Sequence, residues 1–444
     1  MLEEVIDKIS VGYHRLHEKL WVKPLMMCLL SLISIHVANL LEQVEFFQAI
    51  PTVSVDSVVT LLSVLTAGML AIATFAVGAM VNAYHAASTS ATPRSFSAVL
   101  SKDSSQNALS VFIGTFIYSV VGLIFIQNGF LNETGVTLLF WFTVVAYAMV
   151  IYSFVRWLDW IARLGQLGTT IRNEENTTLR AIKRRSISPY IKTIPADVIE
   201  ELDYSASVYS DHVGYVTRID IPLLQQVAKE KGVWIGSEVR PGDYVGLNTV
   251  LCKAWSQHPM PEEFSRSQIM KAFQVQRDRH FDDDPLFGIV VITEIGNRAL
   301  SPGINDPGTA IEVLSSHHRL ISKWATYQGK YRNAKMAYDR VYVPRIQTSE
   351  ILDAAFNSLG RDGAGLIEVA IRIQKTLGSL SRLGGDDYYQ AALRQSELAL
   401  GRALQELRFE PDRERVQALW KSTFAAEGAD SASPHRSKQT GSPN

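Results

Sequence analysis

The densest group of potential metal ligands in the sequence is formed by His280, Asp282, Asp283 and Asp284. Imidazole nitrogens and carboxylate oxygens are ligands that divalent cations accept. The same pattern also has a structural interpretation, in which one helix ends here and Asp284, directly before Pro285, caps the next one. We favour the capping interpretation. We therefore expect no bound cofactor, and His280, Asp282 and Asp283 are only weak candidates for a metal site.

A second polar group lies in the run ALSPGINDPGTA, residues 299–310. The Pro-Gly pair predicts a turn, and Asp306 before Pro307 predicts the N-cap of a helix that continues towards Trp324. The backbone N–H groups at such a helix start can bind an anion, but Asp306 would compete for the same groups. The two polar groups together define a motif of the soluble core: Asp284, Ser301, Pro302, Gly303, Asn305, Asp306 and Pro307.

No pattern typical of a catalytic site accompanies these residues. The sequence contains no HExxH, P-loop or GxSxG pattern. His317 and His318 are adjacent on a predicted helix and therefore point in different directions. The two cysteines, Cys28 and Cys252, are too few for a disulfide framework or a cysteine-based zinc site. We expect a protein that is not an enzyme, with no catalytic residues.

These polar groups are preceded by four long windows without a single Asp, Glu, Lys or Arg. They are residues 24–41, 57–93, 104–132 and 134–155. A helix needs about 20 mostly apolar residues to cross the hydrocarbon core of a bilayer. The pattern predicts four transmembrane helices, at about 24–41, 57–83, 106–127 and 136–157.

The distribution of Lys and Arg predicts the orientation of these helices. The N-terminal segment, the loop with Arg94 and Lys102, and the segment after the fourth window are basic, whereas the loops around 42–56 and 127–135 carry no basic residue. Because basic loops stay in the cytoplasm, both termini are expected to be cytoplasmic. The basic run after the fourth window either binds anionic lipid headgroups or serves only as a stop-transfer flank, which we favour.

The second window carries small or weakly polar residues at steps of three or four, which places them on one face of a helix. They are Thr60, Ser63, Ala67, Ala71, Thr74, Gly78, Asn82 and His85. Two interpretations stay open: close helix packing, which we favour, and a water-facing conduction path. Ser110, Gly114, Tyr118 and Gly122 form a similar line in the third window. Residues at the cytoplasmic mouth between the two windows are Pro93, Arg94, Asp103, Gln106 and Asn107.

The rest of the chain predicts a cytoplasmic α+β domain. Strands are expected at 209–220, 233–239 and 244–255, with a helix at 221–231, in an order similar to the small barrels of biotinyl and lipoyl domains. Helices are expected at 261–281, 285–300 and from 307 onward, a strand-like segment at 341–346, and several helices within 349–424. The predicted divisions are 1–21 (N-terminal segment), 22–160 (transmembrane domain), 161–207 (basic linker), 208–256 (β-barrel-like unit), 257–425 (helical core) and 426–444 (disordered tail).

Three stretches resemble a family of predicted bacterial membrane proteins, domain-of-unknown-function family 2254. They are TPRSFSAVLSKDSSQNALSVFIGTFIYS (92–119), HFDDDPLFGI (280–289) and ALSPGINDPGTA (299–310), and GYVTRIDIPLL and RPGDYV are similar to further segments of the family. The resemblance covers residues 22–425. It implies a multi-pass protein of the bacterial inner membrane with this order of parts, and it assigns no catalytic residue.

The functional hypothesis is an oligomeric ion or small-solute channel gated by its cytoplasmic domain. Four helices enclose little space in a monomer, so a pore is expected on a symmetry axis of a homo-oligomer. The alternative is a membrane-anchored ligand sensor or scaffold without transport activity. The expected partners are membrane lipid and further copies of the chain, and not nucleic acid, because the soluble part is not strongly basic.

Overall fold

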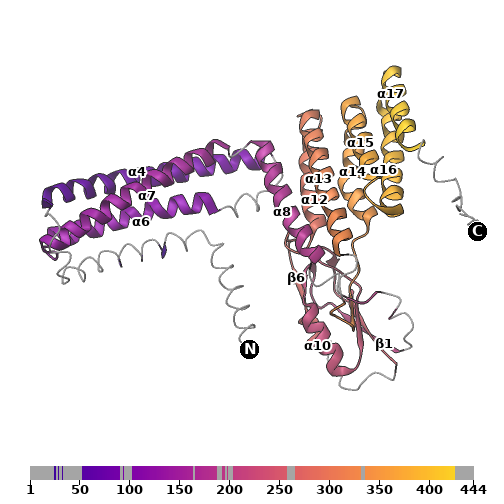
Figure 1. The fold of residues 1–444 in the computed structure, drawn as a ribbon, viewed down its shortest axis with the longest axis horizontal. Helices are drawn as coiled ribbons and strands as arrows, with labels where there is room; N and C mark the ends of the chain where they lie inside the picture. The colour runs from indigo at the N-terminus through magenta and orange to yellow at the C-terminus, as the bar shows by residue number, and fades with distance from the viewer. Residues whose placement is uncertain are drawn as a thin grey trace, which may run out of the picture. The chain divides into compact units, whose positions relative to one another are not determined.

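The computed structural model of the chain describes residues 25, 26, 29, 33, 53–90, 94, 103–163, 166–187, 193–195, 198, 204–257, 266–331 and 336–425. The chain divides into two compact units, Met1–Thr170 and Ile171–Asn444. The described part of the first unit is helical. The second unit combines helices with two small sheets (Figure 1).

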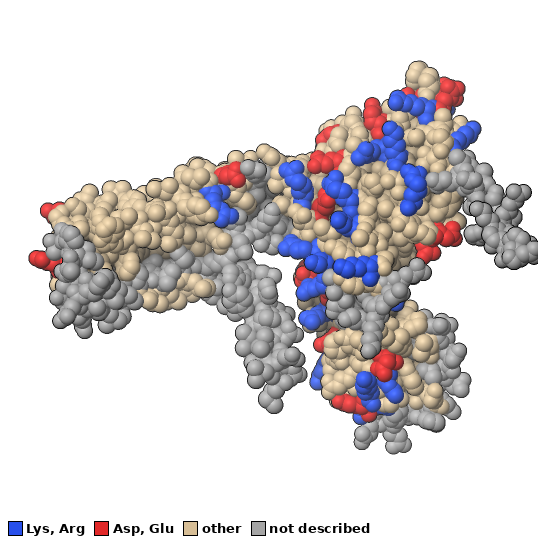
Figure 2. Space-filling model, viewed as in Figure 1, with Lys and Arg blue, Asp and Glu red and all other residues tan. Residues whose placement is uncertain are grey.

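The described part of the first unit contains three long apolar helices: α4 (Val55–Ser90), α6 (Asp103–Gln127) and α7 (Glu133–Arg163). Each has a stretch long and apolar enough to cross a membrane: Val55–Asn82, Asn107–Gln127 and Glu133–Ala162. Their visible face is almost uncharged, whereas Lys, Arg, Asp and Glu gather on the second unit (Figure 2). Three of the four expected spans are thus found as helices, and the expected span at 24–41 lies outside the described residues apart from isolated positions.

Helix α4 packs against α6 and α7 through its larger apolar side chains. Leu62 and Leu65 are fully buried or nearly so in the two cores of this unit. Gly122 of α6 permits the approach, because a Cβ built there would lie 3.2 Å from Leu62 Cδ1. The hydroxyl of Tyr118 lies 3.0 Å from Thr143 Oγ1 of α7. The predicted line of α6, which includes Tyr118 and Gly122, is therefore buried and serves helix packing.

The strands of the second unit form two sheets. The first has the order β1 (Tyr204–Tyr209), β5 (Val250–Ser256), β3 (Trp234–Ser237) and β7 (Val341–Tyr342), and the second β4 (Tyr244–Val245), β2 (Gly214–Ile219) and β6 (Phe273–Gln276). Helix α10 (Ile221–Lys231) matches the expected helix and joins β2 to β3. The two sheets and α10 share one apolar core.

The predicted helix at 261–281 is wrong. Within the described residues 266–281 only the short α11 (Arg266–Met270) is helical, and β6 follows it as an edge strand of the second sheet. Strand β6 pairs antiparallel with β2, with Val275 opposite Val216, and its Phe273 is buried. This pairing joins segments more than fifty residues apart, so it outweighs the local amphipathic pattern. The sheets also extend past the predicted unit 208–256, because β1 begins at Tyr204 and β7 comes from residues 341–342.

Six helices complete the second unit, in two layers. One layer consists of α12 (Pro285–Ala299), α14 (Thr348–Asp362) and α16 (Gly385–Glu406), and the other of α13 (Pro307–Tyr331), α15 (Ile367–Leu380) and α17 (Glu410–Trp420), which ends in the short π-helical turn η2 (Lys421–Ala425). Figure 1 shows these helices side by side. The expected helices at 285–300, from 307 onward and within 349–424 are confirmed.

The segment 161–207, predicted to be a basic linker, contains a helix of its own. Helix α8 (Leu167–Ile187) follows α7 in the chain and, from Ile171 onward, belongs to the second unit. Its charged sequence resembles a solvated linker, but one face of the helix is buried. The predicted tail 426–444 lies outside the described residues.

Candidate functional site

Helix α8 carries a buried face that the sequence analysis missed. The residues on this face recur at steps of three or four and have almost no exposed surface: Ile171, Glu174, Thr178, Ala181, Ile182 and Arg185. Its opposite face is charged, and Arg184 and Arg185 in the last turn complement the negative end of the helix dipole. A search for the helical period in 167–187 would have placed Glu174 on the apolar face.

The closest contact of α8 is with α12. Thr178 lies against Gly288, and a Cβ built on Gly288 would lie 2.8 Å from Thr178 Cβ and closer still to its hydroxyl. The Thr178 hydroxyl donates to Glu174 O at 2.7 Å, so it needs no partner on α12. Only glycine at position 288 lets the two helices meet in this way.

A second contact joins α8 to α13. The Arg319 guanidinium donates to both carboxylate oxygens of Glu175, at 2.7 and 2.6 Å. The hydroxyl of Ser316 donates to the same carboxylate at 2.9 Å. Such a two-pronged pair fixes orientation as well as distance, so Glu175 sets the rotation of α8 on the helical layers.

The last turn of α8 makes a third contact. Arg184 approaches Asp282 at 3.5 Å and Asp283 at 3.9 Å, and Arg185 donates to Pro344 O at 3.4 Å. Two of the basic residues predicted to flank the membrane are therefore engaged inside the second unit.

Glu174 is the unusual member of the buried face. It is fully buried, and neither carboxyl oxygen has a hydrogen-bond partner among the described residues. Burial raises the pKa of this carboxyl to about 8. A charge without a partner is costly in such a place, so Glu174 is mainly protonated and neutral at pH 7. The site can therefore bind and release a proton near neutral pH.

A buried histidine lies on the neighbouring helix α13. His317 has no exposed surface, and its Nε2 lies 2.9 Å from Thr293 Oγ1 of α12. The Thr293 hydroxyl donates to a backbone carbonyl, so Nε2–H is the donor to Thr293 and Nδ1 is left as an unprotonated acceptor without a partner. Burial lowers the pKa of His317 to about 3. His318, as expected, points elsewhere and contacts Ser379 Oγ at 3.0 Å.

The predicted metal ligands around residue 283 have structural roles. Asp284 caps α12 by accepting from Phe287 N at 3.1 Å, and it forms an ion pair with Arg279 at 2.6 Å. Asp282 and Asp283 face Arg184 instead of a shared centre. Among the described residues, no group of three or more His, Cys, Asp or Glu side chains is arranged to hold a metal ion.

The motif at 299–310 is a loop and a helix cap. Asp306 accepts from Thr309 N at 3.1 Å and from Thr309 Oγ1 at 2.6 Å, which confirms it as the N-cap and occupies the N–H groups that an anion would need. Asn305 has a φ of 50°, in the left-handed region. Ser301 donates to Arg298 O at 2.6 Å. Pro302 and Gly303 are exposed, and Pro307 begins α13.

The eight small or weakly polar residues predicted to share one helix face, from Thr60 to His85, lie on α4 and are called the α4 stripe; all eight are exposed. The stripe lies on the side of α4 opposite Val58, Leu65 and Met69, which are buried against the other helices of the unit. Packing among the described residues therefore does not account for the stripe. Of the predicted mouth residues, Arg94 and Asn107 are exposed, Pro93 lies outside the described residues, and Asp103 and Gln106 are placed only as backbone of α6.

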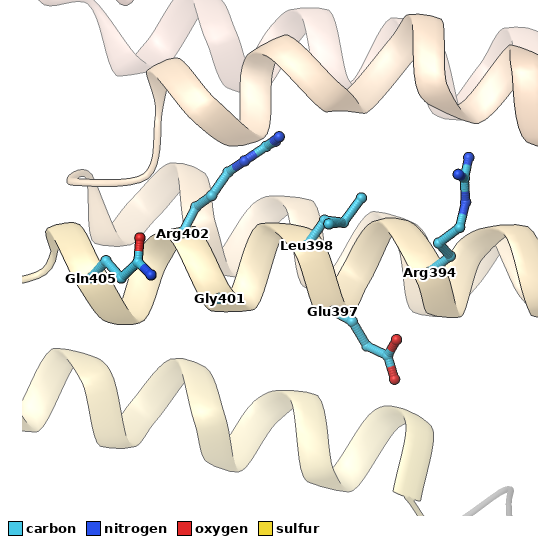
Figure 3. Close-up of a pocket in the computed structure, with 6 residues that line it drawn as sticks. All are labelled: Arg394, Glu397, Leu398, Gly401, Arg402 and Gln405. Atoms are coloured by element: carbon cyan, nitrogen blue, oxygen red, sulfur yellow. The ribbon is translucent and has the colours of Figure 1, made fainter.

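An open groove follows one face of α16. Figure 3 shows its lining side chains along this helix: Arg394, Glu397, Leu398, Gly401, Arg402 and Gln405. Arg394 pairs with Asp353 of α14, and Arg402 donates to Asn357 O at 2.6 Å. Both arginines thus hold α16 on α14, which makes the groove less suited to an anion than its composition suggests.

Comparison with known proteins supports the membrane assignment. A model of the family described as "Predicted membrane protein (DUF2254)" matches residues 17–379. An uncharacterized protein of Mycobacterium bovis and one of Mycobacterium tuberculosis are each 27% identical to this chain over 232 residues. The match covers 48% of this chain and 42% of each relative, so the chain spans less than half the length of these curated relatives. No solved structure matches the chain.

Proposed function

This chain belongs to the DUF2254 family of predicted membrane proteins, and we propose that it assembles into an oligomer that conducts an ion or small solute along helix α4. The observation that carries this proposal is the outward position of the α4 stripe. A lipid-facing helix surface is expected to carry large apolar side chains, as the exposed Val64 and Phe75 do. A row of small and hydroxyl residues instead fits a surface that meets another helix or water.

The hydroxyl groups of the stripe favour a conduction path. Thr60 donates to Asp56 O at 2.7 Å and Thr74 to Leu70 O at 2.9 Å. Because their hydrogens are engaged with the backbone, their oxygen lone pairs face outward and can solvate a cation. Copies of α4 around a symmetry axis would line such a path.

The second unit would then act as the gate. Helix α8 follows α7 in the chain and is held on α12 and α13 by the contacts described above. A change in the docking of α8 would be passed to α7 through the few residues between them. The charge-free window supports a fourth span at 24–41, and the Lys and Arg distribution supports a cytoplasmic second unit. The family resemblance supports the bacterial inner membrane.

Ion flux through liposomes that contain the purified full-length protein tests this proposal. The double variant Ala71→Leu/Gly78→Leu adds bulk to the stripe and is expected to lower K⁺ or Cl⁻ flux at least tenfold. Val77→Leu, which changes an exposed residue beside the stripe, is the matched control and should leave the flux unchanged. Absence of flux in the native protein for all ions tested, or equal flux in the three proteins, would contradict conduction.

A second candidate is a membrane-anchored sensor or scaffold. The observation that favours it is the open α16 groove at one end of the helical layers. This function predicts a ligand-dependent rise in the melting temperature of the full-length protein without any flux, and a loss of that rise in Leu398→Asp. Screening ions and metabolites by thermal shift separates it from the channel.

A further inference from the structure

We propose that Glu174 is a proton-binding site in helix α8 and that its protonation holds α8 docked on helices α12 and α13. This inference does not depend on conduction. It concerns only the state of the helix that connects the last apolar helix of the first unit to the second unit.

The geometry around Glu174 favours a proton over a counter-ion. Both carboxyl oxygens are buried without a hydrogen-bond donor in the described part of the chain, and a negative charge there would be costly. One turn further along α8, Thr178 contacts Gly288 of α12 so closely that a Cβ at position 288 would not fit. Glu174 can therefore become charged with little penalty only when α8 moves away.

The charged groups nearby do not change this conclusion. Glu175 is engaged by Arg319 and Ser316, and His317 is a neutral imidazole bonded to Thr293. None of the ionisable residues on the elements that pack with α8 donates to Glu174, since its oxygens have no partner within the described chain. These residues are Arg172, Glu175, Arg180, Lys183, Arg184 and Arg185 on α8, Glu294 and Arg298 on α12, and Glu312, His317, His318, Arg319, Lys323, Tyr327, Lys330 and Tyr331 on α13.

The direction of the pH effect follows from proton linkage. The pKa of Glu174 is about 8 when α8 is docked, against 4.5 for a solvated glutamate. The docked state therefore retains a proton that the undocked state releases, and raising the pH across this window weakens docking by up to about tenfold per pH unit. Docking is strongest below pH 4.5, and above about pH 8 the stabilisation that protonation of Glu174 gives to docking is lost.

Hydrogen–deuterium exchange of α8 in the full-length protein in detergent tests the inference. Exchange of peptides from 171–187 is measured at pH 6, 7 and 8 in the native protein and in Glu174→Gln, whose side chain has a similar shape and cannot ionise. The ratio of native to variant rates at each pH removes the intrinsic pH dependence of exchange. We expect this ratio to rise more than tenfold from pH 6 to pH 8.

Two further variants separate a proton switch from a structural role. Glu174→Met fills the same space without polar atoms and should also remove the pH dependence. Glu175→Gln breaks the pair with Arg319 and should speed exchange of α8 relative to the native protein. This increase should not follow the pH dependence that Glu174 gives to the native exchange rate. A native-to-Gln ratio that is constant with pH, or faster exchange in both Glu174 variants at every pH, would overturn the inference.

Discussion

Thr178 and Gly288 lie in direct contact where helix α8 meets helix α12. A Cβ added to Gly288 would lie 2.8 Å from the Cβ and 2.8 Å from the Cγ2 of Thr178, and real side chains are not found at such separations. Gly288 belongs to the stretch HFDDDPLFGI, and the same stretch contains Asp282 and Asp283, which face Arg184. This stretch therefore provides much of the surface on which α8 docks.

Gly288→Ala should destabilise the second unit. The added methyl group must push α8 away from α12, and overpacking of this kind costs about 1–3 kcal/mol. The measurement is the melting temperature of the detergent-solubilised protein. Gly329→Ala on α13 is the matched control, because a Cβ there meets nothing within 4 Å, and alanine in place of an exposed helical glycine stabilises by up to about 1 kcal/mol. Equal melting temperatures for the two variants would contradict the contact.

Two glycines of the first unit should respond differently to the same substitution. Gly122→Val adds bulk beside Leu62 at the contact of α6 with α4, whereas the Cβ of a residue at 78 meets nothing within 4 Å. Gly122→Val should lower the melting temperature, and Gly78→Val should leave the fold of the protomer intact. Thermal unfolding followed by circular dichroism in detergent checks both. A loss of structure in Gly78→Val would show that the stripe packs within the protomer.

The two helix caps should differ in strength. Asp306→Ala removes a partly exposed cap of α13 and should cost about 1 kcal/mol. Asp284→Ala removes the buried cap of α12 together with its ion pair to the partly exposed Arg279, so it should cost more, about 2–3 kcal/mol. Asp284→Asn keeps a cap acceptor, and its cost should fall between the costs of the two alanine variants.

Because Asp284 and Asp306 bind protein groups, a chelator such as EDTA should leave all the melting temperatures unchanged. A large drop with EDTA would restore the metal hypothesis.

His317 should make the second unit sensitive to acid. Its pKa is about 3 in the folded protein against 6.5 when solvated, so the unfolded chain binds a proton that the folded chain excludes. The stability from His317 is fully present above pH 6.5 and falls by about 1.4 kcal/mol per pH unit as the pH drops towards 3. Glu174 has the opposite effect, because its raised pKa makes its contribution to stability largest at low pH. Melting temperatures between pH 4 and 7 should fall less steeply in His317→Phe than in the native protein, and the exposed His212→Gln should keep the native slope.

Local sequence patterns were sufficient for several elements of the fold. Proline after aspartate marks the starts of α12 and α13, because Asp284 and Asp306 satisfy N–H groups that the first turn leaves free. Helix α10 has the predicted bounds, with Asp220 as its cap and Gly232 at its end. The apolar windows of α4, α6 and α7 follow from composition alone. Each of these features depends on neighbours within a few residues.

The features that define the candidate site depend on distant parts of the chain. Residues 273–276 are a strand because β2 offers a partner. The helix that carries the buried Glu174 is held by Gly288 of α12 and Ser316 of α13, which contact Thr178 and Glu175. The sequence alone determined that the chain has long uncharged helices and where several helices begin, since hydropathy and capping act locally. Only the tertiary structure decided which face of α4 points outward and that Glu174 has no hydrogen-bond partner among the described residues, because burial and pairing are set by segments that meet only after folding.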